Sequence, residues 1–151
     1  MTLWNRILAA VDDKEASLQA VRYLAGVLGG SDTCRVMLLA VLQRPLADAV
    51  PDPAQRKALT AEKRRQLSES LAAARKELVE AGIPAANVEA HLEEAGGRTV
   101  GETILARQAQ GGYGTVVVGR RNLSKAEEFL FGSVSSDVVH RAANFSVWVV
   151  A

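Results

Sequence analysis

Hydrophobic and polar residues follow two different patterns along the chain. Five short runs rich in valine, isoleucine and leucine recur, separated by longer mixed segments. Runs of this length and composition are typical of strands, and nearly unbroken apolar sequence such as VMLLAVL indicates strands covered on both faces. The predicted strands are residues 6–11, 35–42, 88–92, 115–119 and 146–150.

Between these runs, apolar residues recur every three or four positions, which is the spacing of an amphipathic helix. The second predicted helix should end at Gly82, with Pro84 behind it, and Thr99 with Glu102 forms a capping box for the third. The segment QRPLADAVPDPAQR carries three prolines and is predicted to be one long irregular loop. The four apolar stripes are Ala20, Leu24, Val27 and Leu28; Leu67, Leu71, Ala74 and Leu78; Ile104 and Leu105; and Val134, Val138 and Val139.

The alternation of strands and helices predicts an α/β fold of the doubly wound class. Parallel strands are joined by right-handed crossovers, so helices are expected on both faces of the sheet. The chain has 151 residues, the size of one ordinary domain. Because no internal repeat or shift of composition marks a boundary, the sequence predicts a single domain over residues 1–151.

The balance of charges narrows the range of partners. Lysine and arginine total 18 against 17 acidic residues, a formal net charge of +1, so no overall field attracts nucleic acid or an acidic membrane. No apolar run reaches the roughly 18 residues of a membrane span, and the N-terminal sequence lacks the pattern of a signal peptide. The single cysteine, Cys34, is expected to be buried and inert. We therefore expect a cytoplasmic protein that binds neither nucleic acid nor membrane.

One strand-to-helix loop has the features of a phosphate site. Ligands of open parallel sheets bind outside the carboxyl ends of the strands, so loops that follow a strand are the candidates. The loop after the fourth predicted strand begins at Gly119 and ends at Gly132 and Ser133. The N–H groups of the next helix, with the hydroxyls of Ser133 and Ser135, suit an anion. The alternative is that Ser133 is only an N-cap and Gly132 only a turn residue.

Three charged residues at the same edge of the sheet are further candidates. Asp12 and Asp13 end the first predicted strand, where one can cap a helix and the other can hold a ribose hydroxyl or a divalent metal. Arg120 can reach phosphates as a charge-assisted donor, or can belong to a solvated loop surface. No Walker motif occurs, and no nucleophile lies beside a recognisable base, so no catalytic residue is predicted.

These segments together resemble the universal stress protein family over essentially the whole chain. The matching segments are RILAAVDDKEAS, the proline-containing loop, TVVVGRRNLSKAEEFLFGSVSSDVVHRA and the final strand SVWVV. ATP-binding members carry G-x2-G-x9-G-(S/T) after the fourth strand. This chain has the same spacing with Asn122 in place of the second glycine. Asparagine tolerates a left-handed backbone, but its side chain can collide with a ligand where glycine cannot.

The resemblance implies a strand order of 3-2-1-4-5 and a site for ATP with Mg²⁺ or Mn²⁺. In similar proteins the aspartate matching Asp12 lies by the ribose and the metal, and the backbone around Val41 meets adenine. Asp12 is therefore the implied metal ligand. The residues implied to bind the nucleotide are Ala10, Asp12, Val41, Gly119, Arg120, Asn122, Gly132, Ser133, Val134 and Ser135.

The last predicted strand, Ser146–Val150, would be an edge strand in that order, and its unpaired backbone groups need covering. Similar proteins form a two-fold dimer through this strand, so we expect a homodimer; the alternative is a short, protected edge. Three functions remain open: a regulatory dimer that binds ATP and an unknown protein partner, an interaction protein that has lost nucleotide, and a slow ATPase. Asn122 favours the second, and the third has least support because no base is evident to position water.

Overall fold

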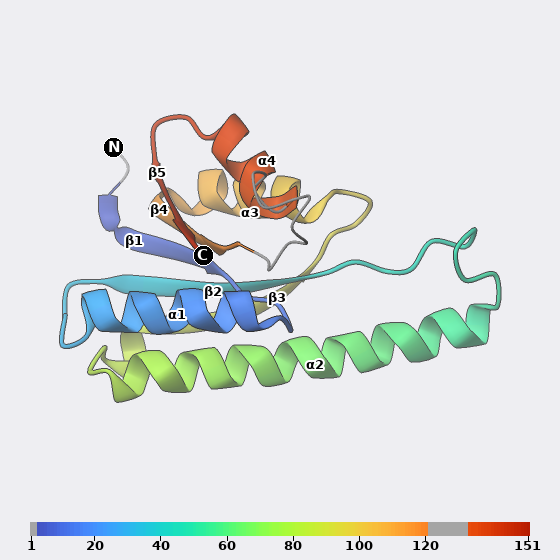
Figure 1. Ribbon diagram of the computed structural model, residues 1–151, viewed down its shortest axis with the longest axis horizontal. Coiled ribbons are helices and arrows are strands. Elements are labelled where there is room, and N and C mark those ends of the chain that lie inside the picture. Colours follow the sequence, from blue (N-terminus) through green and yellow to red (C-terminus); the bar gives the residue numbers. More distant parts are fainter. Residues whose placement is uncertain (1–2, 121–132) are drawn as a thin grey trace.

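The computed structural model describes residues 3–120 and 133–151, and within them five strands form one parallel sheet in the order β3-β2-β1-β4-β5 (Figure 1). This confirms the predicted α/β class and the strand order that the resemblance implies. The strands are β1 Leu3–Ala10, β2 Arg35–Leu42, β3 Val88–Glu94, β4 Tyr113–Gly119 and β5 Ser146–Val150.

Helices cover both faces of the sheet, with α1 and α2 on one side and α3 and α4 on the other (Figure 1). The sheet therefore separates two apolar clusters. Leu24, Leu38 and Leu78 belong to the cluster under α1 and α2, and Leu8 and Ile104 belong to the cluster under α3 and α4. The helices are α1 Glu15–Leu28, α2 Pro53–Glu80, α3 Val100–Gly111 and α4 Ser133–Arg141, with a short 3-10 helix at Ala85–Asn87.

Three of the strands are longer than their apolar runs predicted. β1 begins at Leu3 and β4 at Tyr113, and these two residues pair with each other. β3 continues through Glu93 and Glu94, which pair with the last two residues of β2. Backbone pairing carries β3 into polar residues and carries β1 and β4 across Asn5 and Gly114, which interrupt the apolar runs, so the hydrophobic pattern underestimates the strand length.

The loop predicted over residues 43–56 is shorter than expected, because its last four residues form the first turn of α2. Asp52 is the N-cap, and its side chain accepts a hydrogen bond from the amide of Ala54 at 3.1 Å. Pro53 occupies the first helical position, where its missing N–H is not needed. The proline that indicated a loop therefore begins the helix.

The ends of the helices agree with most of the predicted signals. Thr99 and Glu102 form both hydrogen bonds of the capping box at 3.1 Å. α2 ends at Glu80, and Gly82 follows with φ of +100°, a conformation that favours glycine. The expected apolar stripe of α1 is wrong at Val27, which is 51% exposed, because the helix buries Val21 and Ala25 instead. Val139 of α4, also placed in a stripe, is 37% exposed.

Cys34 is fully buried, as its apolar surroundings indicated. Across residues 3–120 and 133–151, no helix is long and apolar enough to cross a membrane.

Candidate functional site

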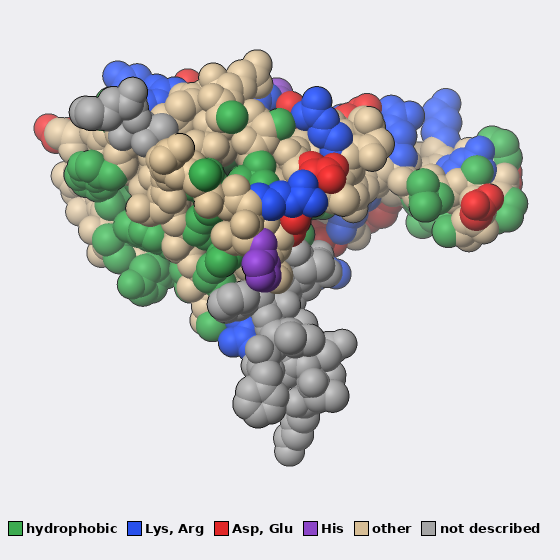
Figure 2. Space-filling view, turned by 90° about the horizontal axis from the view of Figure 1, so that it is seen from above, with side chains coloured by type: hydrophobic (Ala, Val, Ile, Leu, Met, Phe, Trp, Pro, Cys, Tyr) green, Lys and Arg blue, Asp and Glu red, His purple; other side chains and the backbone are tan. Residues whose placement is uncertain are grey.

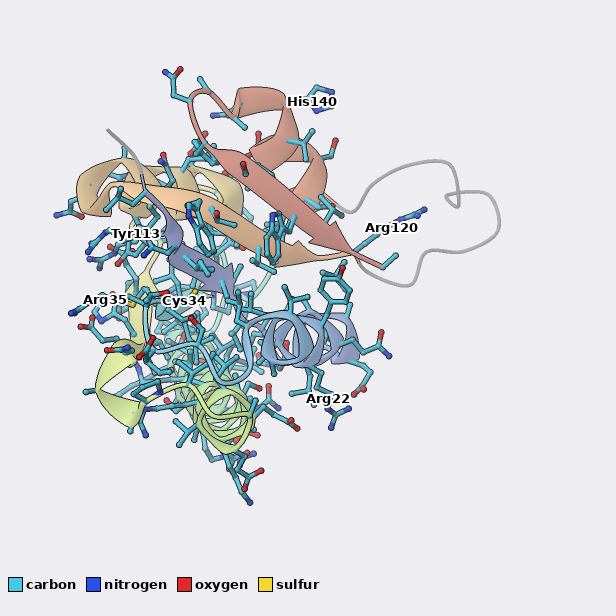
Figure 3. All side chains as sticks on the ribbon, turned by 90° about the vertical axis from the view of Figure 1, so that its left-hand side faces the viewer. Arg22, Cys34, Arg35, Tyr113, Arg120 and His140 are labelled. Atoms are coloured by element: carbon cyan, nitrogen blue, oxygen red, sulfur yellow. The ribbon has the colours of Figure 1, made fainter. Side chains whose placement is uncertain are left out.

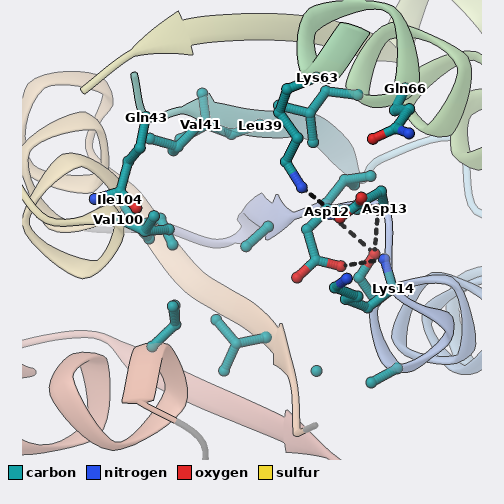
Figure 4. A pocket seen from close by; sticks show the side chains of 18 of the residues that line it. Asp12, Asp13, Lys14, Leu39, Val41, Gln43, Lys63, Gln66, Val100 and Ile104 are labelled. Atoms are coloured by element: carbon teal, nitrogen blue, oxygen red, sulfur yellow. Dashed lines mark hydrogen bonds and ion pairs between the residues drawn. The ribbon is translucent and has the colours of Figure 1, made fainter. Parts of the chain in front are cut away.

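A cavity of about 630 Å³ opens at the carboxyl edge of the sheet, where β1, β2 and β4 end and α1 and α4 begin (Figure 4). Its volume lies in the range of about 300–1,000 Å³ that is usual for small-molecule sites. β1 lies between β2 and β4, so the chain connections diverge at this point. Crevices of this kind are where doubly wound sheets bind ligands.

One wall of the cavity is apolar and rigid. Leu39, Ile104 and Val118 line it and are at most 1% exposed, while Val41 and Val100 line it and are half-buried. The first three belong to the cluster under α3 and α4, so packing holds them in place. A wall of this composition suits a flat ring system rather than a charged group.

Asp12 provides a carboxylate on the polar side of the cavity. Its Oδ1 accepts a hydrogen bond from the amide of Lys14 at 2.8 Å, and its second carboxylate oxygen faces the cavity (Figure 4). The amide of Asp12 donates to Ser17 Oγ at 3.0 Å, and that hydroxyl donates to the carbonyl of Asp12 at 3.1 Å. The turn from β1 into α1 is therefore fixed. The N-cap of α1 is Lys14, without a side-chain cap, so neither aspartate takes the predicted capping position.

Asp13 forms an ion pair across the cavity with a residue of α2. The Nζ of Lys63 lies 2.8 Å from Asp13 Oδ1, and both residues line the cavity. The hydrogen bond from Lys63 and its positive charge lower the pKa of Asp13 below its usual range. Lys63 was not predicted from the sequence as a site residue. It belongs to the polar run EKRRQ, 50 residues from Asp13, and nothing in that run distinguishes it from its charged neighbours.

Gly119 lines the cavity, but the structure gives a packing reason for the glycine. A Cβ atom at this position would lie 2.5 Å from the carbonyl oxygen of Ala16 and 3.0 Å from the amide of Ser17. Backbone atoms cannot give way to such a contact as a flexible side chain can. The end of β4 and the first turn of α1 can approach this closely only because residue 119 has no side chain.

The next residue, Arg120, extends the sheet rather than lining the cavity. Its amide donates to the carbonyl of Val150 at 2.7 Å, which continues the pairing of β4 with β5. Figure 3 shows its side chain beyond the carboxyl ends of these two strands.

The start of α4 closes the side of the cavity opposite α2. Val134 and Ser135 line it, and Ser135 is 1% exposed. Ser133 is the first residue of the helix. The predictions for Asn122 and Gly132 lie outside the described residues. Of the predicted site residues, the structure brings together around one cavity Ala10, Asp12, Val41, Gly119, Val134 and Ser135.

A parallel sheet of this order with a crevice at its carboxyl edge defines a Rossmann-like α/β protein. The chain belongs to the universal stress protein family, whose family model matches residues 4–151. No curated protein sequence matches the chain significantly.

Solved structures share this fold along the whole chain. Universal stress protein UspA from Lactobacillus plantarum has a TM-score of 0.78 at 15% identity, with 100% of both chains covered. A universal stress protein from Archaeoglobus fulgidus in complex with dAMP has a TM-score of 0.66 at 21% identity, again with 100% of both chains covered. A universal stress protein in complex with cAMP has a TM-score of 0.66 at 16% identity, covering 97% of this chain and 96% of its own.

Proposed function

We propose that this member of the family is a regulatory module that binds ATP together with Mg²⁺ or Mn²⁺. The observation that carries the proposal is the single cavity in which an apolar wall, the carboxylate of Asp12 and the first turn of α4 meet. Adenine would lie against Leu39, Val41 and Ile104, and the ribose near Asp12. The phosphates would lie between Asp12 and the N-terminus of α4, where helix N–H groups and the helix dipole favour negative charge. The relatives in complex with dAMP and cAMP support an adenine nucleotide as the ligand.

A divalent cation fits this site as a companion of the nucleotide. The described residues contain no group of three histidine, cysteine, aspartate or glutamate side chains that could hold a metal. Asp12 offers one carboxylate oxygen to the cavity. Mg²⁺ is usually held by one or two carboxylates, with substrate phosphates and water completing its ligands. The cation would therefore bind between Asp12 and the phosphates and would balance their charge.

The edge of β5 supports a homodimer as the working form of the module. β5 ends the order of the sheet, so one side of Ser146–Val150 has no neighbouring strand among the described residues. Val147, Trp148, Val149 and Val150 are only partly buried in the single chain. We propose that β5 of a second copy covers this edge, because an exposed apolar edge strand normally needs covering. A regulatory protein partner would then respond to nucleotide bound in the dimer.

Calorimetric titration of Mg-ATP into nucleotide-free protein tests the proposal. We expect saturable binding of about one ATP per chain. Asp12→Asn keeps an acceptor for the amide of Lys14 but removes the charge, so it should weaken Mg-ATP binding by about tenfold or more, the scale of a lost charge-assisted contact.

Asp48→Asn is the matched control, since Asp48 is exposed in the loop before α2 and does not line the cavity. This variant should bind like the parent protein. Folded parent protein that shows no binding heat at several temperatures would contradict the proposal and favour the nucleotide-free interaction protein.

A further inference from the structure

Lys63 brings a positive charge to the wall of the cavity that α2 forms, beside the apolar Leu59 and Leu67 of the same helix. The first buried residue of α2 is Leu67, one turn after Lys63. The ammonium group of Lys63 reaches from α2 toward the loop between β1 and α1 (Figure 4). The side chain of Lys63 is 39% exposed and that of Asp13 is 19% exposed, so solvent and ligand can reach the lysine.

Among the described residues, the charges that line the cavity balance only when Lys63 is counted. The charged residues that line it are Asp12, Asp13, Lys14, Arg44, Glu62 and Lys63. Arg44 also pairs with Glu94, and Glu62 with Arg65, both outside the cavity. The remaining charges are two aspartates and two lysines. Without Lys63 this corner would carry net negative charge, which would oppose an anionic ligand.

The ammonium group of Lys63 has bonding capacity beyond its present partner. A lysine carries three N–H donors on a flexible stem, and Asp13 accepts one of them in the structure. The Lys63 ammonium can therefore turn toward a ligand oxygen without any movement of the α2 backbone. Asp13 and a phosphate oxygen offer similar charge-assisted bonds, so they compete for the same group.

We propose that Lys63 is a phosphate-binding residue of this cavity, drawn from Asp13 to the bound ligand, and that it favours nucleotides with several phosphate groups over monophosphates. This inference rests on the proposed nucleotide site. It predicts opposite effects for the two partners of the ion pair. Removing Lys63 removes a ligand contact, whereas neutralising Asp13 removes a competitor and leaves the lysine available.

The test compares the dissociation constants of ATP and AMP for the parent protein, Lys63→Gln, Asp13→Asn and Lys57→Gln. Lys57 is an exposed lysine of α2 that does not line the cavity, so it controls for the net charge of the helix. We expect Lys63→Gln to weaken ATP binding about tenfold and AMP binding less than about threefold, the scale of one charge-assisted bond in a half-exposed site. Asp13→Asn should tighten ATP binding, and Lys57→Gln should change neither constant. Circular dichroism and urea midpoints establish that each variant is folded.

Two outcomes with functional parent protein would overturn the inference. If Lys63→Gln and Asp13→Asn both weaken ATP binding, Lys63 serves to position Asp13. If Lys63→Gln changes the ATP and AMP constants by the same factor, it makes no contact with the additional phosphates. Both outcomes leave the nucleotide site intact. The parent protein is titrated before the variants. If it binds neither nucleotide, the proposed function and this inference are both overturned.

Discussion

The two halves of α2 belong to one continuous helix but are attached to the protein in different ways. The second half buries Leu67, Leu71, Ala74 and Leu78 against the sheet and α1. The first half, residues 53–66, buries none of its side chains and extends away from the sheet beside the loop after β2 (Figure 1). The end of this projection carries exposed apolar and charged side chains (Figure 2).

Ion pairs attach the first half of α2 to the rest of the molecule. Lys63 pairs with Asp13 at 2.8 Å and Arg64 pairs with Glu94 at 2.5 Å, and Glu94 also accepts a bond from Arg44. Exposed ion pairs contribute little to stability, typically below about 1 kcal/mol each. Apolar burial in the second half therefore determines the position of α2, whereas the first half is held weakly, by exposed polar contacts such as those of Lys63 and Arg64.

The largest expected loss of stability comes from a substitution in the second half of α2, whose apolar side chains are buried. Leu78 is 0% exposed, and Leu78→Ala should lower the free energy of unfolding by about 2–5 kcal/mol because it leaves a cavity in the core. Leu59 in the first half is 45% exposed, and Leu59→Ala should cost less than about 1 kcal/mol. Urea unfolding of both variants measures the difference. Equal losses would show that the first half is packed as firmly as the second.

An intermediate effect is expected at the helix caps. Thr99 caps α3, which packs on the sheet through Ile104, so Thr99→Ala should lower the free energy of unfolding by about 1 kcal/mol. Asp52 caps the projecting half of α2, so Asp52→Ala should fray the first turn with little effect on global unfolding. Amide hydrogen exchange over residues 54–60, beside a urea titration, separates local from global loss. A global loss from Asp52→Ala similar to that from Thr99→Ala would contradict the weak attachment of the first half.

The smallest expected effect on stability is the loss of the ion pair between Lys63 and Asp13 at acid pH. Lys63 lowers the pKa of Asp13, so the folded state binds a proton at this carboxylate less readily than the unfolded chain. The stabilisation is therefore present above the unfolded pKa, near about 3.9, and is lost as the pH falls through the lower folded value. Between pH 6 and pH 2.5 the parent protein should lose more stability than Asp13→Asn, by less than about 1 kcal/mol because Lys63 is over one-third exposed. Identical pH profiles of unfolding would show that the pair stabilises nothing.

Much of the fold was predictable because burial leaves a direct record in the sequence. β2 lies between β3 and β1 and is covered on both faces. Its bounds are the predicted ones, 35–42. The sequence patterns led to wrong predictions at Pro53 and at Val27. Pro53 begins a helix inside what the prolines indicated as loop, and Val27 fits the helical spacing yet faces solvent.

The candidate site was predictable only in the part that the topology brings together. Ala10, Asp12 and Val41 lie at or next to the ends of the adjacent strands β1 and β2, and parallel pairing places those ends at one edge. The ion pair between Asp13 and Lys63 was not predictable, because it depends on where a long polar helix face lies relative to the sheet. Neither the periodicity of apolar residues nor the spacing of motifs in the sequence predicts how that helix face lies.

The close approach of Gly119 to Ala16 affects how glycine motifs should be weighed in related sequences. The fold itself excludes a side chain at this position, whether or not a ligand binds. A relative that lost its nucleotide during evolution would still be selected to keep this glycine. A comparison of homologues should therefore give the first glycine of the motif little weight as a marker of ligand binding, and should judge retention of the ligand from positions that the packing of β4 against α1 does not constrain.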